Sequence, residues 1–192
     1  MDPQLQDKKA ALRRTIRDRL KGIDSAQRAR ASAAACSLIQ AEAIWKQSRA
    51  ILFYAPMAEE PDIWPLVEVA LAGNKVAALP RYDSGRSEYV ASRVKDLAGD
   101  IQAGRFGIRE PKGECEVLGL DQIDLVLVPG LVFDVKGNRL GRGLGFYDRL
   151  LAQYRGIKCG VCFEEQVVEE LPMGAHDILV NWVLTPKRMI RK

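Results

Sequence analysis

Two neighbouring runs carry the strongest signal in the chain: Val128-Pro129-Gly130-Leu131-Val132-Phe133-Asp134 and Gly137-Asn138-Arg139-Leu140-Gly141-Arg142-Gly143-Leu144-Gly145-Phe146-Tyr147-Asp148-Arg149. The glycines of the second run lie between an apolar, strand-like segment, Leu125–Val128, and a helix-like segment, Phe146–Tyr154. Glycine lets backbone N–H groups turn toward one point, and a helix N-terminus adds unpaired donors and a positive dipole end. The order strand, glycine-rich loop, helix therefore predicts an α/β fold with an anion site at this loop.

The charged residues within the loop indicate which kind of anion it would bind. Arg139 and Arg142 can make forked contacts to phosphate oxygens, whereas Asp148 would repel a phosphate unless a cation such as Mg²⁺ lay between them. This combination favours a metal–nucleotide complex. The alternative is a surface loop whose glycines serve tight turns and whose arginines are solvated.

The rest of the chain alternates between predicted strands and helices. Helices are predicted from Leu5 to Leu20 with Gly22 ending the first, from Asp24 or Ser25 to about Trp45, over Ile63–Ala72 and from Phe146. Strands are predicted at Ala50–Tyr54, Lys75–Leu79 (stopped by Pro80), Tyr89–Val94, Leu125–Val128, Ile157–Phe163 and Leu179–Thr185. Three further segments are predicted to be less regular: a polar turn or short helix over Lys95–Gln102, an extended loop over Arg105–Pro111 and a helical turn around Gln166–Glu170. We expect a single three-layer α/β domain over residues 1–192, with a largely parallel open sheet and helices on both faces.

Composition limits the class of partner. The chain has 192 residues, 47% of them hydrophobic, and a net charge of only +4, which does not call for nucleic acid. No apolar run approaches the roughly 20 residues that span a bilayer, so no membrane partner is expected. The start of the chain lacks the apolar core of a signal peptide, and we expect a cytoplasmic protein that acts as a monomer.

The cysteines and the histidine are poor candidates for a site. The four cysteines are too few and too scattered for a disulfide framework, and Cys159 and Cys162 form a C-x-x-C spacing within a predicted strand. We interpret that pair as core residues rather than a zinc or redox site. A lone histidine such as His176 is more often a surface or capping residue than a catalyst.

Polar residues follow several predicted strands. Glu59 and Glu60 come after the first, Arg81 and Tyr82 after the second, and Asp177 precedes the last. In open α/β sheets the carboxyl ends of the strands meet at one crevice, where ligands bind. Lys9 and Arg13, four residues apart, share a face of the first helix, although basic residues in such a pattern more often form a solvated face.

The glycine-rich run resembles the G-x-R-L-G-x-G-x-G-[FY]-Y-D block of the 5-formyltetrahydrofolate cyclo-ligases. The resemblance extends to the V-P-G-x-x-F-D run, to the later runs Gly160–Gln166, Leu171-Pro172 and His176-Asp177, and to Lys9–Arg13 with its K-x-x-L-R form. It implies an ATP-dependent enzyme that converts 5-formyltetrahydrofolate to 5,10-methenyltetrahydrofolate, ADP and phosphate, with ATP, Mg²⁺ and a reduced folate as its ligands.

The resemblance also implies roles for individual residues. ATP would be held by Lys9, Arg13, Arg139, Gly141, Arg142, Gly143, Gly145 and Asp148; the metal by Asp148 and Asp177; the folate by Met57, Glu60, Tyr82, Phe106 and Tyr147; and Arg142, Arg139 and Tyr147 would act in catalysis. Glu59 is an alternative to Glu60, because the local pattern of the chain departs from that of the family.

Two departures keep other functions open. Ile63 stands where the family usually has Thr, and Leu144 where many relatives carry Lys or Gly. A folate- or nucleotide-binding protein without turnover is one alternative. An ATP-dependent kinase or ligase for another small amide is the other, since fold alone does not set the substrate.

Overall fold

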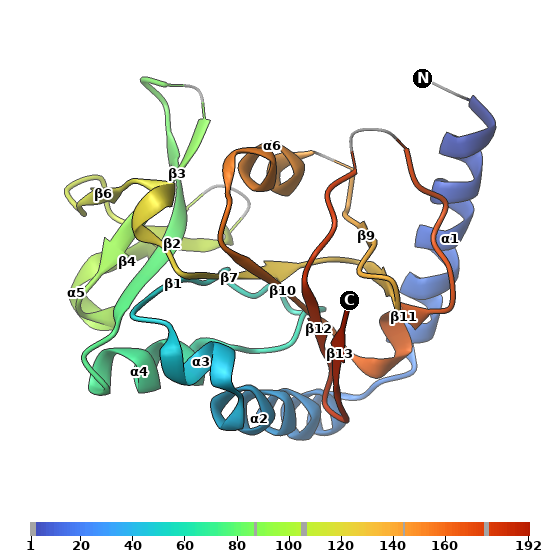
Figure 1. Cartoon of the computed structure of the whole chain (residues 1–192), viewed down its shortest axis with the longest axis horizontal. Helices are drawn as coiled ribbons and strands as arrows, with labels where there is room; N and C mark the ends of the chain where they lie inside the picture. Colours follow the sequence, from blue (N-terminus) through green and yellow to red (C-terminus); the bar gives the residue numbers. More distant parts are fainter. Residues whose placement is uncertain (1–2, 87, 105–106, 144, 175–176) are drawn as a thin grey trace.

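The computed structural model describes residues 3–86, 88–104, 107–143, 145–174 and 177–192. Within these residues an eight-stranded sheet crosses the molecule (Figure 1). Its strands, in spatial order, are β13 (Met189–Arg191), β12 (Trp182–Leu184), β10 (Ile157–Val161), β7 (Leu125–Pro129), β1 (Ala50–Leu52), β2 (Val76–Asp83), β3 (Glu88–Val94) and β6 (Val117–Leu118).

The middle of this sheet is parallel. β12, β10, β7, β1 and β2 pair in parallel, whereas β13, β3 and β6 add antiparallel edges. The side chains of Leu125–Val128 are fully buried, as expected for a central strand covered on both faces. The predicted largely parallel open sheet is therefore confirmed.

Helices cover both faces of the sheet. α2 (Ser25–Ala41), α3 (Ala43–Gln47) and α4 (Trp64–Ala72) lie below it in Figure 1, and α6 (Phe146–Gln153) lies above it. On the first face Ile39, Trp45 and Leu66 pack against strand residues, and on the second Leu151 packs over Val126. This is the predicted three-layer arrangement.

The first helix lies beside the layers. α1 (Pro3–Lys21) packs Ile16 and Leu20 against a small sheet formed by β11 (Val167–Val168), β8 (Val132–Asp134) and β9 (Arg139–Leu140). Between β7 and α6, where a loop was predicted, the chain forms the strand pair β8–β9. The predicted phosphate loop thus begins with a small hairpin, and α1 lies next to it.

Several predicted boundaries were wrong. The second predicted helix breaks at Glu42, which has extended backbone and separates α2 from α3. β2 continues through Pro80 to Asp83, because β1 pairs it only as far as Ala78. Proline has no N–H to donate, so it is tolerated at a strand position where a backbone N–H would have no neighbouring strand to bond.

The remaining elements are short. α5 (Leu97–Asp100) is the predicted short helix. The predicted extended loop contains a short strand, β5 (Arg109–Pro111), which pairs with β4 (Ile101–Ala103). Single turns of 3-10 helix, η2 (Leu120–Gln122) and η3 (Glu164–Gln166), complete the described elements. The cysteines are free, and Cys159 and Cys162 are buried in the core, as predicted. None of the described helices combines the length and apolar character that crossing a bilayer requires.

Candidate active site

The predicted residues gather where the direction of the strand connections reverses. From β1 the chain runs through α4 to β2 on one side, and from β7 it runs through α6 to β10 on the other. The loops that follow the adjacent carboxyl ends of β1 and β7 therefore lead to opposite sides, and open α/β sheets usually bind ligands in the crevice at such a reversal. One wall is the segment that follows β1 and contains Glu59 and Glu60. The other is the glycine-rich loop after β7.

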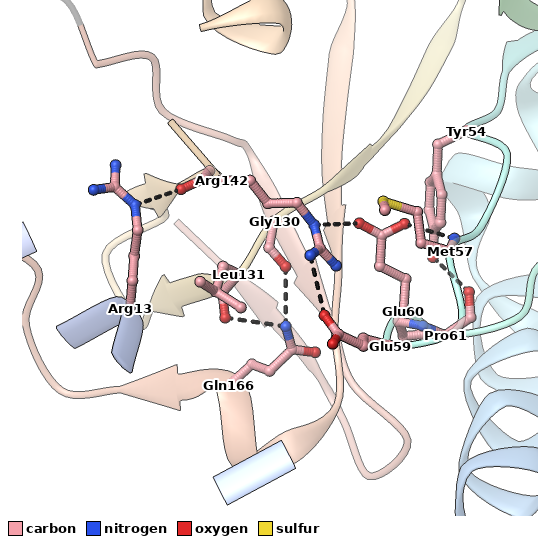
Figure 2. Close-up of polar contacts among 11 residues, drawn as sticks. Arg13, Tyr54, Met57, Glu59, Glu60, Pro61, Gly130, Leu131, Arg142 and Gln166 are labelled. Atoms are coloured by element: carbon pink, nitrogen blue, oxygen red, sulfur yellow. Dashed lines mark hydrogen bonds and ion pairs between the residues drawn. The ribbon is translucent and has the colours of Figure 1, made fainter. Parts of the chain in front are cut away.

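Arg142 bridges these two walls. Its Nε donates to Glu60 Oε1 at 3.4 Å and its Nη1 to Glu59 Oε2 at 3.0 Å (Figure 2). The side chain of Arg142 is 29% exposed, that of Glu60 9% and that of Glu59 54%. One guanidinium thus holds a nearly buried carboxylate and an exposed one.

Glu60 is held by its own loop as well. The N–H of Met57 donates to Glu60 Oε2 at 3.0 Å, and the hydroxyl of fully buried Tyr54 donates to the carbonyl of Pro61 at 2.8 Å (Figure 2). Burial raises the pKa of Glu60 above its usual value, against the smaller opposing effects of the Met57 N–H and Arg142. The loop therefore presents a fixed, partly desolvated carboxylate at the crevice.

Arg139 lies in β9 rather than on an exposed loop. Its side chain is only 3% exposed, it forms an ion pair with Asp148 of α6, and its guanidinium lies 5.9 Å from the centre of the Tyr147 ring. Among the described residues Arg139 Nε is buried without a hydrogen-bond partner. A buried donor left in this state suits an additional acceptor, such as water or a ligand oxygen.

α1 brings two more cations to the loop. Lys9 forms an ion pair with Asp177, which also accepts from the Gly174 N–H at 2.6 Å. Arg13 Nε donates to the carbonyl of Gly141 at 2.9 Å (Figure 2). The helix face that carries both residues thus meets the glycine-rich loop through Arg13 and the segment before β12 through Lys9.

The glycines of the loop adopt backbone that other residues rarely take. Gly143 has φ +111° and Gly145, which precedes α6, has φ +64°. Asp134 shapes the start of the loop, because it accepts from the N–H groups of Lys136, Asn138 and Leu171. The loop so formed leads into the N-terminus of α6 and contacts α1 at Gly141.

The residues predicted for the folate lie at the other end of the crevice. Tyr82 and Tyr89 meet edge to face with ring centres 5.2 Å apart, and Met57 is exposed. Burial raises the pKa of Tyr147, and Glu60 and Tyr89 add to the increase. Glu60 and Tyr89 therefore both lie near Tyr147. Phe106, Leu144 and His176 lie outside the described residues. Ile63, the other departure from the family pattern, is a fully buried core residue beside α4.

Sequence reasoning missed three supporting residues. Buried Gln166 donates from Nε2 to the carbonyls of Gly130 (2.9 Å) and Leu131 (3.0 Å), and so braces the turn after β7 (Figure 2). Arg109 stacks over the Trp64 ring at 4.2 Å. Tyr54 is the third. Gln166 was quoted only as part of a motif, and nothing in the spacing indicates which carbonyl a buried amide or hydroxyl reaches.

The predicted metal ligands are each paired with a cation. Asp148 is 34% exposed beside Arg139, and Asp177 is 18% exposed beside Lys9. The described part of the chain contains no group of three or more His, Cys, Asp or Glu side chains arranged to hold a metal ion. Asp177 lies close enough to Arg13 to influence its pKa, so this acid adjoins the predicted phosphate ligands.

The chain resembles known proteins over most of its length. The model of the 5-formyltetrahydrofolate cyclo-ligase family matches residues 5–186. A mouse protein named 5-formyltetrahydrofolate cyclo-ligase is 30% identical, with 92% of each chain covered, and one from Mycolicibacterium smegmatis is 35% identical over 74% of this chain and 76% of the relative.

Solved structures give the same result. The NMR structure of 5,10-methenyltetrahydrofolate synthetase from Aquifex aeolicus is similar with a TM-score of 0.86 and 34% identity, covering 95% of this chain and 92% of that one. A Mycoplasma pneumoniae protein of the same name has a TM-score of 0.74 at 20% identity over 93% and 98% of the two chains, a likeness that concerns the fold.

Proposed function

The chain belongs to the 5-formyltetrahydrofolate cyclo-ligase family, and from this we propose that it catalyses the ATP-dependent cyclisation of 5-formyltetrahydrofolate to 5,10-methenyltetrahydrofolate, with release of ADP and phosphate. The observation that carries the proposal is the family match over residues 5–186. The gathering of the predicted residues at the crevice between β1 and β7 supports it.

The proposed chemistry needs no protein nucleophile. The formyl oxygen attacks the γ-phosphorus of ATP and ADP leaves, which gives a phosphorylated imino intermediate. The neighbouring N10 amine then attacks the formyl carbon and loses its proton, and phosphate leaves with the former formyl oxygen. Positioning and stabilisation of charge on the transferred phosphoryl group are enough for such a reaction.

The cations of the crevice suit the phosphates. Lys9 and Arg13 would bind them from α1, Arg142 from the glycine-rich loop and Arg139 from β9, while Gly141, Gly143 and Gly145 would let the loop backbone approach. The unpartnered Nε of Arg139 supports this role, because a phosphate oxygen would complete its hydrogen bonding.

The pairing of these cations favours a metal–nucleotide complex over a bare anion. Lys9 is neutralised by Asp177 and Arg139 by Asp148, so a bare phosphate would leave two carboxylates unpaired. Two partly exposed carboxylates fit Mg²⁺, which uses few protein ligands and keeps several waters. Asp148 and Asp177 would hold the ion, and the chemistry that Mg²⁺ supplies when bound is neutralisation of charge on the phosphates.

The folate would lie on the Glu60 side. The carboxylate of Glu60 would accept from the adjacent N–H donors of the pterin, and Tyr82 and Tyr147 would pack against its rings, with Met57 at the rim and Phe106 as a further stacking candidate. Tyr147 lies near both Glu60 and Arg139, so it would contact the folate where the phosphoryl group is transferred.

The test is formation of the methenyl product. Purified protein is mixed with Mg-ATP and 5-formyltetrahydrofolate, and the near-ultraviolet absorbance of the product is followed. We expect product that requires ATP, is lost in Arg142→Ala and persists in Arg93→Ala, whose arginine pairs with Glu116 at the outer edge of the sheet. Binding of both ligands without product would leave a binding protein, and ADP release with other amides alone would indicate a different ligase.

A further inference from the structure

The two carboxylates on Arg142 are held in different ways. Glu60 is nearly buried and also accepts from the N–H of Met57, whereas Glu59 is more than half exposed. Among the described residues the carboxylate of Glu59 accepts a hydrogen bond only from Arg142. Glu59 is therefore the partner that Arg142 can release without leaving a buried charge alone.

A basic groove lies on the other side of Glu59. Its volume is about 320 Å³, and its lining residues are Arg14, Arg17, Asp18, Leu20, Lys21, Arg28 and Glu59. Asp18 is paired with Lys21. Within the described chain neither Arg14 nor Arg17 forms an ion pair closer than 4.0 Å, so the groove has cations able to receive a carboxylate.

The groove adjoins the predicted phosphate ligands. Arg17 follows Arg13 by one helical turn and lies close enough to lower the pKa of Arg13. Arg13 in turn contacts the carbonyl of Gly141, next to Arg142. Glu59 thus lies between two sets of cations, one that would bind phosphate and one that would not.

We infer that Glu59 sets the affinity of the site for ATP by competing with phosphate for the guanidinium of Arg142, and that the displaced carboxylate is received by Arg14 and Arg17 in the groove. This inference rests on the proposed function. Phosphate binding at Arg142 requires the Glu59 contact to break, and the two neighbouring arginines reduce the cost of breaking it.

The first measurement is the Kd for Mg-ATP by calorimetry, without folate. Glu59→Gln keeps the shape of the side chain and removes its charge, and Asp18→Asn removes the same charge from the same groove without touching Arg142. We expect Glu59→Gln to lower the Kd about two- to fivefold at low salt, the range for an exposed ion pair. The gain should shrink as salt rises, and Asp18→Asn, which changes only the long-range field, should lower the Kd by clearly less.

A second measurement tests the receiving role of the groove. Arg17→Ala is introduced into the unaltered protein and into Glu59→Gln, and the two losses of ATP affinity are compared in a double-mutant cycle. Arg17 attracts ATP at long range in both backgrounds. It receives Glu59 in only one, so the loss should be larger when Glu59 is present.

The outcomes separate this inference from the proposed function. If the unaltered protein binds ATP and makes product, an unchanged or weaker Kd in Glu59→Gln, an equal gain in Asp18→Asn, or equal losses in the cycle overturn the competition. If the unaltered protein neither binds ATP nor makes product, the proposed function fails and this inference fails with it.

Discussion

Lys9 and Asp177 are 168 positions apart in the chain and form a nearly buried ion pair that joins the first helix to the segment before β12. Removing one partner leaves the other with little access to water, which costs more than the pair itself contributes. We therefore expect Asp177→Asn to lower the free energy of unfolding by roughly 2–4 kcal/mol, measured by urea denaturation.

Replacing both partners separates stability from binding. Lys9→Met with Asp177→Leu leaves no unpaired charge, and we expect it to recover most of the lost stability. Its affinity for Mg-ATP should stay low, since both proposed ligands are absent. Full ATP affinity in this double variant would remove Lys9 and Asp177 from the proposed site.

Glu60 should give the protein a pH-dependent stability. Its pKa is raised in the folded state, so the folded chain binds this proton more tightly than the unfolded chain. The free energy of unfolding contributed by this group is therefore highest at acid pH and falls as pH rises from the pKa of an exposed glutamate to the higher pKa of Glu60. Above that pKa the loss is complete.

Glu60→Gln removes this titration. Urea denaturation of both proteins from about pH 4 to about pH 8 should show the falling limb only in the unaltered protein, and the variant should gain relative stability across it. Parallel curves would show that Glu60 titrates normally. The KM for folate should rise with acid over the same pH window, if the pterin needs the ionised carboxylate.

Tyr54 should matter for the folate end of the site. Tyr54→Phe leaves the carbonyl of Pro61 without its donor, which should cost about 1 kcal/mol and loosen the loop that holds Glu60. The matched control is Tyr154→Phe, whose buried hydroxyl donates to the carbonyl of Ile123 ahead of the amino end of β7. Both variants should lose similar stability, but initial rates should show a higher KM for folate only in Tyr54→Phe. Equal KM values would make Tyr54 purely structural.

Gly160 should be intolerant of a side chain. A Cβ at this position would lie 2.3 Å from the buried ring of Phe133, which also packs closely over Gly130. We expect Gly160→Ala to destabilise the protein by about 1–3 kcal/mol in urea denaturation. Gly113→Ala, where a Cβ meets open space, is the control. Adding Phe133→Leu to Gly160→Ala should restore part of the loss, and a loss that persists unchanged would rule out the ring contact as its cause.

The layers of the fold were predictable because they depend on local pattern. The apolar run Leu125–Val128 and the helical spacing of Leu12, Ile16 and Leu20 are strong signals, and both elements are present. The two-residue strand at Arg139–Leu140 is too short to show a period, so Arg139 was assigned to a loop. The order of the strands depends on contacts between distant segments, which no window of sequence contains.

The sequence names candidate site residues one by one, but not the pairs that they form. The resemblance named Lys9, Arg13, Arg142 and Asp177 without indicating that Lys9 meets Asp177 or that Arg142 bridges two glutamates. Such partners depend on side chains meeting across the finished fold. Use of ATP and Mg²⁺, a monomeric state and a cytoplasmic location remain predictions.

The packing of α1 also bears on how the protein is made. Its buried residues, Ile16 and Leu20, contact a cluster supplied largely by residues from Leu131 to Leu171, and its cations meet Gly141 and Asp177. During synthesis α1 must therefore wait until the segments up to Leu171 and Asp177 have been made before it can dock. A nascent chain would thus lack the proposed nucleotide site until those later segments have followed, so a shorter product would not sequester ATP.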